Sequence, residues 1–433
     1  MRKRLVAALA GVVLVGGVGA AAVLRDGGVA VTSAPQQLPS PYPTRTPLLA
    51  AADEGAVPST AGLQRALAAP LRDRGLGGRV SLSVVDVASG RSLLGVEAQR
   101  EVTPASTAKI ATAVAALTAL SPDLRLRTTV VAGSRPGEVV LVGGGDASLD
   151  AAGLASLAAQ LRKAGTPATR VLVDDSLFPG PRLGPAWKPG YVQHGDVAPV
   201  SALAVDQGRT SQHDGSPRVA DPALAAGRQL ARLLGVRAVS RGQAPSGATR
   251  LASVSSAPLS GLVEKMLTNS DNDLAEALGR QVALASGKPA SFEGEAAAVA
   301  GVLGRLGVDV GLRDASGLSP LDRVRPAAVT ALLTRAAQGQ RYGALLSGLP
   351  VAGFDGTLGS RFRTGTTQVA AGEVRAKTGT LDGVSALAGL VVTRDGRLLA
   401  FDLTADGVAV GATIPAERAL DRVATALASC GCT

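Results

Sequence analysis

The chain has 433 residues, which is long enough for two or three domains with large buried cores. It carries 44 Lys and Arg residues against 34 Asp and Glu residues, which gives a formal net charge of +10 at pH 7. No run of basic residues interleaved with aromatic residues could follow a nucleic-acid strand, so we predict no nucleic-acid partner. The charge fits either an anionic surface or an Arg-rich background that has no partner.

The first residues predict a membrane segment. Three basic residues precede an apolar run from Leu5 to Leu24. About 20 apolar residues after a positive flank are typical of a helix that spans a membrane with its N-terminus in the cytoplasm. A cleaved signal peptide is the alternative, because residues 20–22 are small. We assign residues 1–25 to an anchor or signal peptide, favour an anchor in the cytoplasmic membrane through residues 5–24, and expect the rest to be exported.

Residues 26–59 predict an extended linker, because Pro, Ser, Thr and Ala dominate them. The two cysteines of the chain, Cys430 and Cys432, lie at its C-terminal end. In an oxidising compartment they could bond to each other or to another chain, and a tail without a role is the alternative. The sequence therefore predicts no disulfide framework for the fold.

A helix over residues 63–71 and a β-hairpin over residues 79–94 begin the folded part. The next helix is predicted from Thr103 as its N-cap, with a proline at its first position. Ser106 and Lys109 are three residues apart on this helix and therefore neighbours on one face. Lys109 can accept the Ser106 proton if burial or another cation keeps its amine neutral. Such a pair is usually a surface feature, but no other lysine of the chain has a serine three residues before it.

The next region has short predicted strands, at residues 127–132 and 138–142, separated by Gly-rich turns. The loop Gly143–Leu149 lacks the Lys-Ser/Thr pair of a P-loop and the spacing of a dinucleotide-binding loop, so we interpret it as a turn. Up to about residue 248 the pattern stays mixed. We predict that this region is an insertion in the surrounding fold.

A polar turn, Thr268–Asn272, lies between two predicted helices. It contains Asn269 and Asn272, which are the only asparagines of the chain, on either side of Ser270. Capping explains one asparagine more easily than two, so the pair suggests that amide chemistry is needed at this turn.

Sheet strands are predicted near the C-terminus. Two apolar runs, Val384–Val392 and Leu398–Leu403, are joined by a tight turn and are typical of paired strands. Lys377 and Thr380 lie near the end of the strand before them. Gly379 between them would let a ligand backbone approach closely.

Three motifs follow one another in order: Ser106-x-x-Lys109, Ser270-Asp271-Asn272 and Lys377-Thr378-Gly379. Together they resemble the signature of the penicillin-binding protein and serine β-lactamase superfamily. The long interval between the first two motifs is similar to that of the D-alanyl-D-alanine carboxypeptidase/endopeptidase family, the class C low-molecular-mass penicillin-binding proteins. The likeness extends over about Leu82 to Thr404, with departures at Ala315, where glycine is expected, and at Gln207–Gly208, where an acidic residue and Asn are expected.

This resemblance implies an α+β fold. A catalytic domain like that of serine β-lactamases and penicillin-binding proteins, an antiparallel sheet flanked by helices, would carry a large mixed α/β insertion between the first and second motifs. The catalytic domain would then comprise residues 60–125 and 249–433, and the insertion residues 126–248. We expect the insertion to be dispensable for acylation but not for the choice of substrate.

The resemblance also implies D-Ala-D-Ala carboxypeptidase activity on peptidoglycan stem peptides through a serine acyl-enzyme, with DD-endopeptidase activity left open. Its catalytic residues would be the nucleophile, the base, a proton relay and two substrate-holding groups: Ser106, Lys109, Ser270, Asn272 and Lys377. Substrate binding would add the strand residues Thr378, Gly379 and Thr380. The backbone N–H groups of Ser106 and Thr380 would form the oxyanion hole.

The expected partners are stem peptides that end in D-Ala-D-Ala and β-lactam antibiotics as covalent inhibitors. We expect no cofactor and no metal. The resemblance places the folded part on the extracytoplasmic side of the cell membrane or in the cell wall of a bacterium.

Four alternatives compete with this interpretation. A serine β-lactamase is the closest, and it has far less sequence between the first two motifs. A catalytically inactive peptidoglycan-binding domain of the same fold would not need the motif side chains, yet all are present. A Ser-His-Asp hydrolase or a zinc peptidase needs histidines at the site, and the chain has only His194 and His213, both inside the insertion.

Overall fold

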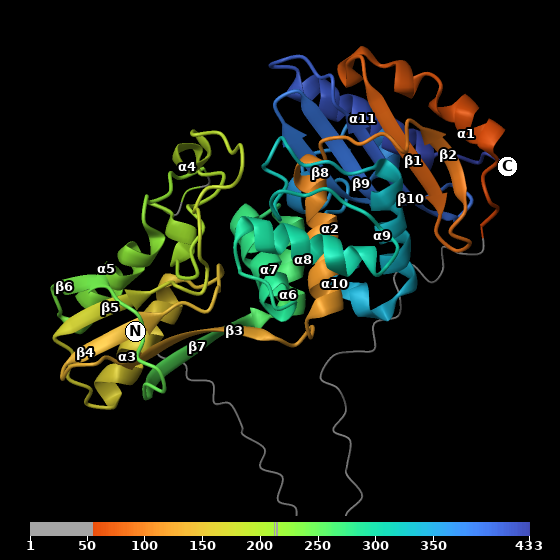
Figure 1. Cartoon of the computed structure of the whole chain (residues 1–433). Coiled ribbons are helices and arrows are strands. Elements are labelled where there is room, and N and C mark those ends of the chain that lie inside the picture. The colour runs from red at the N-terminus through yellow and green to blue at the C-terminus, as the bar shows by residue number, and fades with distance from the viewer. Residues whose placement is uncertain (1–54, 212, 214) are drawn as a thin grey trace, which may run out of the picture. The chain divides into compact units, whose positions relative to one another are not determined.

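The structure is a computed structural model, and it describes residues 55–211, 213 and 215–433. The predicted anchor, residues 1–25, and most of the predicted linker, residues 26–59, lie outside these residues. Within the described ranges, no helix is both long and apolar enough to cross a membrane. These ranges contain two five-stranded sheets, one antiparallel and one mixed (Figure 1). The predicted α+β fold class is confirmed.

The first sheet is antiparallel, with the strand order β2-β1-β10-β9-β8. Its strands are β1 (Val80–Asp86), β2 (Ser92–Val96), β8 (Val374–Leu381), β9 (Val384–Val392) and β10 (Leu398–Ala405). β9 and β10 are buried along almost their whole lengths, as continuous apolar runs require. The β1–β2 hairpin and the β9–β10 pair agree with the sequence prediction. β8 is an edge strand: residues 350–352 pair with its first half, at Val374 and Ala376. Among the described residues, its second half, which carries the third motif, has no strand partner on that side, so this part of the edge is open to a ligand.

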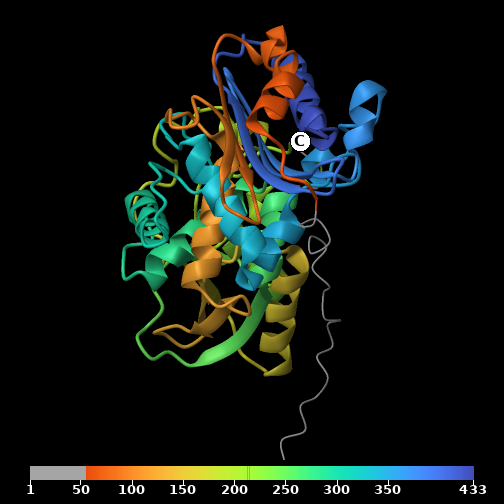
Figure 2. The same ribbon diagram turned by 90° about the vertical axis from the view of Figure 1, so that its right-hand side faces the viewer.

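Helices cover both faces of this sheet (Figure 2). On one face, α1 (Thr60–Leu67) and α11 (Thr413–Ala428) share an apolar cluster with the sheet. The other face carries a helical layer in a second apolar cluster. The helices of this layer are α2 (Ala108–Ala119), α6 (Leu259–Thr268), α7 (Asn272–Ala285), α8 (Phe292–Gly304), α9 (Pro326–Gln338) and α10 (Gly343–Gly348). The turn before α2 packs directly against β8, which brings the first and third motifs together.

The second sheet is formed by residues between the first and second motifs. β4, β5 and β6 are parallel, and β3 pairs antiparallel with β4 and with β7. The strands are β3 (Arg125–Ala132), β4 (Glu138–Val142), β5 (Arg170–Asp174), β6 (Ala238–Arg241) and β7 (Arg250–Pro258). α3 (Ala151–Lys163) and α5 (Pro222–Leu234) pack on this sheet. We call these residues the insertion; its edge strand β7 lies beyond residue 248.

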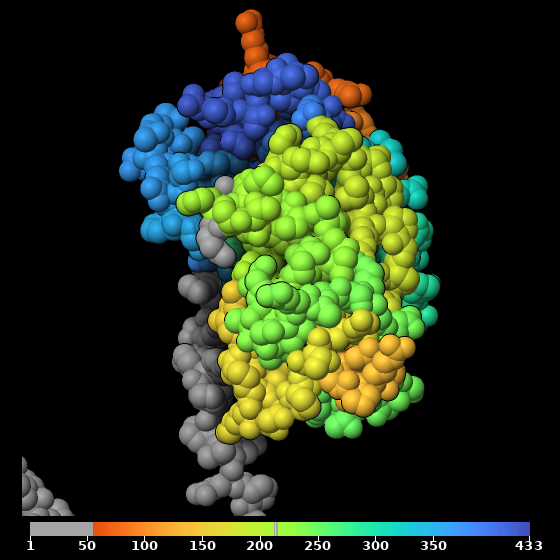
Figure 3. Space-filling model, turned by 90° about the vertical axis from the view of Figure 1, so that its left-hand side faces the viewer, coloured from red at the N-terminus to blue at the C-terminus, as the bar shows by residue number. Residues whose placement is uncertain are grey.

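The insertion also contains a long irregular segment with the short helix α4 (Tyr191–His194). Figure 3, in which the insertion is coloured yellow to green, shows that it makes up much of one face of the molecule. Trp187 and Tyr191 of this segment belong to an apolar cluster with Phe292 of α8 and Leu318. The segment therefore packs on the catalytic domain and not only on its own sheet.

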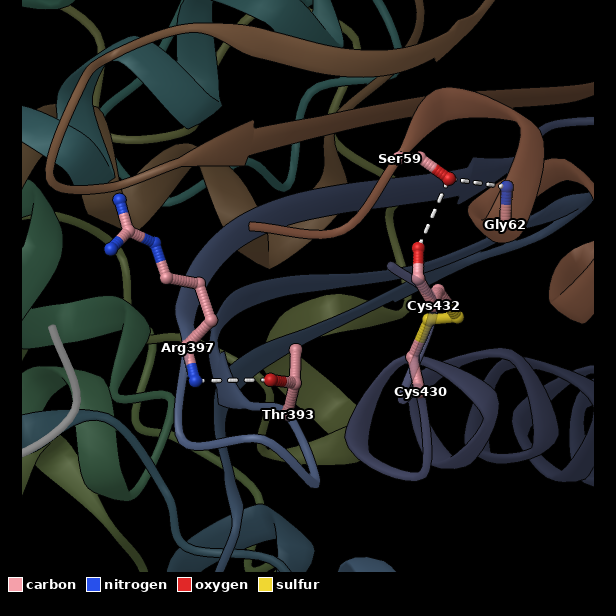
Figure 4. The surroundings of a disulfide bond; sticks show 6 residues. All are labelled: Ser59, Gly62, Thr393, Arg397, Cys430 and Cys432. Atoms are coloured by element: carbon pink, nitrogen blue, oxygen red, sulfur yellow. Dashed lines mark hydrogen bonds between the residues drawn. A yellow bond between two sulfur atoms is a disulfide. The ribbon is translucent and has the colours of Figure 1, made fainter. Parts of the chain in front are cut away.

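The C-terminal tail is fastened to the start of the folded part (Figure 4). Cys430 and Cys432 form a disulfide with each other, which decides between the alternatives left open by the sequence. Ser59 donates hydrogen bonds to the carbonyl oxygen of Cys432 from its backbone N–H, at 2.7 Å, and from its hydroxyl, at 3.1 Å. The same Ser59 hydroxyl accepts the N–H of Gly62 and caps α1. The tail and the first helix thus form one local unit.

Candidate active site

The turn that carries Ser106 is not part of α2. α2 begins at Ala108, and Ala105–Thr107 form a 3-10 turn before it. The predicted helix start at Thr103 was wrong because Ala105 has φ of +48°, a left-handed conformation that a right-handed helix cannot include. Residues in this region of φ cost about 1–3 kcal/mol and persist only where the surroundings enforce them. The turn leaves Ser106 partly exposed at the surface of a buried helix.

Two glycines enforce this turn by close approach. A Cβ atom on Gly317 would lie 1.9 Å from the carbonyl oxygen of Ala105. A Cβ atom on Gly379 of β8 would lie 2.8 Å from the carbonyl oxygen of Pro104. Any larger residue at either position would push the serine turn out of place. Gly379, the glycine of the third motif, therefore lets β8 pack against the turn that carries the nucleophile. The approach of a ligand backbone to Gly379, expected from the sequence, stays a prediction.

Lys109 is fully buried and makes three short contacts. Its Nζ lies 2.9 Å from Ser106 Oγ, 2.6 Å from Asn272 Oδ1 and 2.6 Å from the carbonyl oxygen of Ser316. The last two oxygens can only accept hydrogen bonds. A neutral amine can give its two N–H groups to them, and its lone pair then faces the hydroxyl of Ser106. This is the geometry that a general base needs.

Burial also adjusts the charge of this amine. Desolvation lowers the pKa of Lys109 to about 8, although the nearby carboxyls of Asp314 and Glu276 act in the opposite direction. Roughly a tenth of Lys109 is thus neutral at pH 7, far more than of a lysine in water with a pKa of about 10.4.

The second motif forms the turn between α6 and α7. Ser270 has φ of +56°, and Asp271 caps α7 by accepting the N–H of Leu274 at 3.0 Å. Asn272 is the first residue of α7. Its Oδ1 accepts from Lys109, and its Nδ2 donates to the carbonyl oxygen of Asp196 in the insertion at 2.9 Å. The structure thus brings Asn272 of the second motif into direct contact with Lys109 of the first.

The third motif lies on β8. Lys377 is fully buried, and its Nζ donates to the carbonyl oxygen of Thr378 at 2.9 Å. Burial, together with the like charge of Lys109, lowers the pKa of Lys377 well below its usual value. The Thr378 hydroxyl donates to the hydroxyl of Thr357 at 2.9 Å. Thr380 directly follows the motif on the same strand, two positions before the tight turn into β9.

The loop Asp314–Ser319, called here the 314–319 loop, is a part of the site to which sequence analysis assigned no role. It supplies the carbonyl oxygen of Ser316 to Lys109. Asp314 organises the loop by accepting the N–H groups of Gly317, at 2.6 Å, and Ser319, at 2.7 Å, together with the indole N–H of Trp187. Burial raises the pKa of Asp314 to about 6, with Glu276 as a second cause. A backbone carbonyl has no residue-type signature, so sequence patterns could not have found this contact.

The described residues contain no group of three or more His, Cys, Asp or Glu side chains that could hold a metal ion. The side chains of the site place a hydroxyl beside a buried amine of lowered pKa, with a second buried amine on the edge strand β8. This combination of fold and site defines the class of penicillin-binding proteins and serine β-lactamases.

Comparison with known proteins narrows the class to one family. The profile of the D-Ala-D-Ala carboxypeptidase 3 (S13) family matches residues 63–214 and 210–427. The chain belongs to this family.

Named relatives agree with this placement, and a solved structure shares the fold. The chain is 40% identical over 420 residues to Carboxypeptidase DacB of Mycolicibacterium smegmatis, covering 91% of this chain and 90% of the relative. It is 30% identical over 439 residues to the D-alanyl-D-alanine carboxypeptidase of an Actinomadura species, covering 80% and 81%. The crystal structure of penicillin binding protein 4 from Haemophilus influenzae is similar in fold, with a TM-score of 0.72 at 24% identity, covering 84% of this chain and 97% of that one.

The predicted family is therefore confirmed, and with it the prediction of a serine-type D-Ala-D-Ala carboxypeptidase. The structure brings Ser106, Lys109 and Asn272 into direct contact and packs β8 against the serine turn. The chemical role of each side chain stays a prediction.

Proposed function

We propose that Ser106 is the nucleophile and Lys109 the base of a hydrolase that cleaves the terminal D-Ala-D-Ala bond of peptidoglycan stem peptides. The observation that carries this proposal is the distance of 2.9 Å between Lys109 Nζ and Ser106 Oγ, with the other contacts of the amine taken by two acceptors. Neutral Lys109 takes the hydroxyl proton while Ser106 Oγ forms a bond to the substrate carbonyl carbon.

The oxyanion formed by this attack would be stabilised by the backbone N–H groups of Ser106 and Thr380. Both lie where the serine turn meets β8, so the donors are fixed before the substrate arrives. When the C–N bond breaks, the leaving amine takes the proton that Lys109 accepted, relayed by the hydroxyl of Ser270, which lies two residues before Asn272 in the second motif. Water then attacks the ester carbonyl. One proton of the water passes to Ser106 Oγ as the ester C–O bond breaks, and the shortened peptide leaves as a carboxylic acid.

Binding of the substrate is assigned to the open edge of β8. Lys377, with Thr378 and Thr380, would receive the terminal carboxylate, and Gly379 allows the peptide backbone to approach. Asn272 would hold the substrate amide, although Lys109 and the carbonyl of Asp196 engage both ends of its side chain in this structure. A β-lactam presents a strained amide and a carboxylate in the same arrangement, so it would acylate Ser106 and leave slowly.

The setting of this activity is also a proposal. Peptidoglycan lies outside the cytoplasmic membrane, so the folded part would act there, held by residues 5–24. Residues 26–59 would serve as the linker. We place the catalytic domain at about residues 60–125 and 249–433, with the insertion between them; the sheet pairing of β7 favours moving the second boundary to Pro258.

Mass spectrometry of the purified chain tests the roles of the residues. After penicillin, we expect an adduct of the whole drug on the peptide that contains Ser106, and none in Ser106→Ala. With a D-Ala-D-Ala peptide, we expect release of D-Ala. An adduct on another residue, or equal labelling of Ser106→Ala, would overturn the assignment. Fast release of the drug without release of D-Ala would instead identify a β-lactamase, and cleavage of a crosslinked dimer would add endopeptidase activity.

A further inference from the structure

Lys109 is held by the carbonyl of Ser316, whose own peptide is anchored by Asp314 through the N–H of Gly317 at 2.6 Å. The preceding peptide, between Ala315 and Ser316, is fixed from two sides. The backbone N–H groups of Ala315 and Ser316 donate to the same carboxylate oxygen, Glu276 Oε1, at 3.2 Å and 2.9 Å. The carbonyl oxygen of Ala315 accepts from the hydroxyl of Thr112 at 2.6 Å. Glu276 lies on α7 and Thr112 on α2, three residues after Lys109. The peptide between Ala315 and Ser316 is thus held between the two helices of the site.

Glu276 is in turn held by a buried cation. Its Oε2 lies 3.1 Å from Arg280 Nη1, and the same nitrogen lies 2.6 Å from Glu295 Oε2 on α8. The guanidinium carbon of Arg280 is 4.3 Å from the centre of the Phe292 ring, within the range of a cation–π contact. All three charged side chains are at most 1% exposed. None of them reaches the surface where substrate binds.

Two carboxyls share one buried guanidinium in this cluster. Desolvation raises the pKa of Glu295 well above its usual value, and the charge of Arg280 acts in the opposite direction. A buried ion pair such as that of Glu276 and Arg280 is a weak source of stability, because desolvation consumes most of the attraction. Stability alone therefore does not explain the pair. The contact of Glu276 with the 314–319 loop indicates a second role, in the active site.

We propose that Glu276 is a positioning residue for acylation: held by Arg280, it orients the 315–316 peptide so that the Ser316 carbonyl fixes the amine of Lys109 against Ser106. The proposal rests on the role of Lys109 proposed above. It predicts that loss of the Glu276 contact slows acylation even when Lys109 is fully neutral. A purely structural role predicts no such effect.

The test compares Glu276→Gln with a matched control, Glu295→Gln, in the purified chain. Both change a buried partner of Arg280, but only Glu276 touches the 314–319 loop. The amide of Glu276→Gln would turn N–H donors toward the guanidinium, which also only donates, so the side chain must move. Glu295→Gln replaces the carboxyl by an amide of the same shape. The acylation rate constant with fluorescent penicillin is measured from about pH 6 to about pH 10. The fraction of protein labelled at the end of the reaction measures how much of each variant is folded and active.

We expect the rate of Glu276→Gln on its high-pH plateau to fall on the order of 10- to 100-fold, as misplacement of a catalytic group does. Glu295→Gln should stay within a few-fold of wild type. The midpoint of Glu276→Gln should also move to lower pH, because the carboxyls of Glu276, Asp314, Asp271 and Asp322 raise the pKa of Lys109, against the like charge of Lys377. An unchanged plateau overturns the proposal, whether or not the midpoint moves.

If Glu276→Gln does not fold, Thr112→Val decides the question. It removes the other anchor of the same peptide without a change of charge or much change of shape. A lower plateau with full final labelling supports the proposal, and a wild-type plateau overturns it. Ser106→Ala and Lys109→Arg are measured beside these variants. If Ser106→Ala and Lys109→Arg acylate at the wild-type rate, the proposed function fails. If these two are inactive but the Glu276 and Thr112 variants acylate at the wild-type rate, only the positioning role fails.

Discussion

Lys109 and Lys377 are both fully buried, but the two walls of the site surround them differently. In the helical wall, formed by α2, α7 and the 314–319 loop, Lys109 meets three oxygen atoms, and carboxyls act on it from nearby. In the strand wall, formed by β8, Lys377 donates to one backbone carbonyl among the described residues. Its pKa is lowered by burial and by Lys109.

This difference assigns different tasks to two residues of the same type. The helical wall is arranged before a ligand binds, so it suits a base whose proton transfer needs a fixed geometry. In the strand wall, the Lys377 amine makes one hydrogen bond among the described residues, so it can donate further hydrogen bonds to a ligand. A ligand carboxylate placed there would supply the missing counter-charge and favour the ammonium form of Lys377. The walls can be separated experimentally, because changes in one should affect rate and pH dependence and changes in the other should affect recognition of the carboxylate.

The largest effect is expected from Lys109→Arg. A guanidinium keeps the positive charge but is never a base at accessible pH, so acylation by penicillin should fall by about 10³-fold or more. Lys288→Arg, at an exposed lysine, serves as the control and should acylate like wild type. Acylation by Lys109→Arg within a few-fold of wild type would show that Lys109 only neutralises charge. The base would then have to be sought in Ser270 and Lys377.

The pH dependence of wild-type acylation tests the helical wall without a mutation. The reactive form of Lys109 is the neutral amine, and its pKa is about 8, so the rate should rise with pH and level off above that value. Below the midpoint the neutral fraction falls tenfold per pH unit, and at pH 6 the rate should be about 100-fold below the plateau. Stopped-flow acylation across this range measures it. A profile that stays flat through pH 8 would mean that the proton goes elsewhere.

Much of the helical wall could be predicted from the sequence, but its details could not. The residues Ser106, Lys109 and Asn272 follow from motif and spacing, and the structure places them in contact. The left-handed Ala105 could not be foreseen, because alanine is a strong helix former and only packing against Gly317 and Gly379 enforces the turn.

The Glu276–Arg280 pair illustrates a second limit. Spaced four residues apart on a helix, the two residues have the pattern of an exposed ion pair. They are buried because α7 lies inside the helical layer, which only the assembled fold reveals. Ala315, where the family resemblance predicts glycine, is a third case. A Cβ atom on Gly279 would lie 2.5 Å from the Cβ of Ala315, so Gly279 of α7 leaves the space that the extra methyl group needs.

In the strand wall, Lys377→Met should weaken the use of substrates that carry a terminal carboxylate. Loss of a charged hydrogen bond of about 1.5–3 kcal/mol corresponds to a fall in kcat/KM of about 10- to 100-fold. The matched control is the same peptide with an amidated C-terminus. The variant and the wild type should hydrolyse the amide at similar rates, because neither gains a charge contact from it. An equal loss on both substrates would place Lys377 in the chemistry instead of in recognition.

The smallest expected effect concerns the insertion, which the sequence predicted to be dispensable for acylation. In the structure, Gln207 of the insertion donates from Nε2 to Asp271 Oδ2 at 2.6 Å, and Asp271 caps the helix that begins with Asn272. Gln207→Leu keeps the volume but removes this hydrogen bond, which is worth about 1 kcal/mol. If the insertion steadies the second motif, acylation should slow by several-fold.

Gln229→Leu is the control for this last prediction, because Gln229 is half-buried on α5 of the same insertion, near Gln207 in space, but makes no hydrogen bond to the second motif in the described part of the chain. Both variants should keep the thermal midpoint of unfolding close to that of wild type, so that any difference between them reports on the site. Slower acylation in Gln207→Leu alone would make the insertion a third support of the helical wall, beside α2 and α7. Equal acylation in both variants would leave the sequence prediction standing, and the insertion would then act only on the choice of substrate.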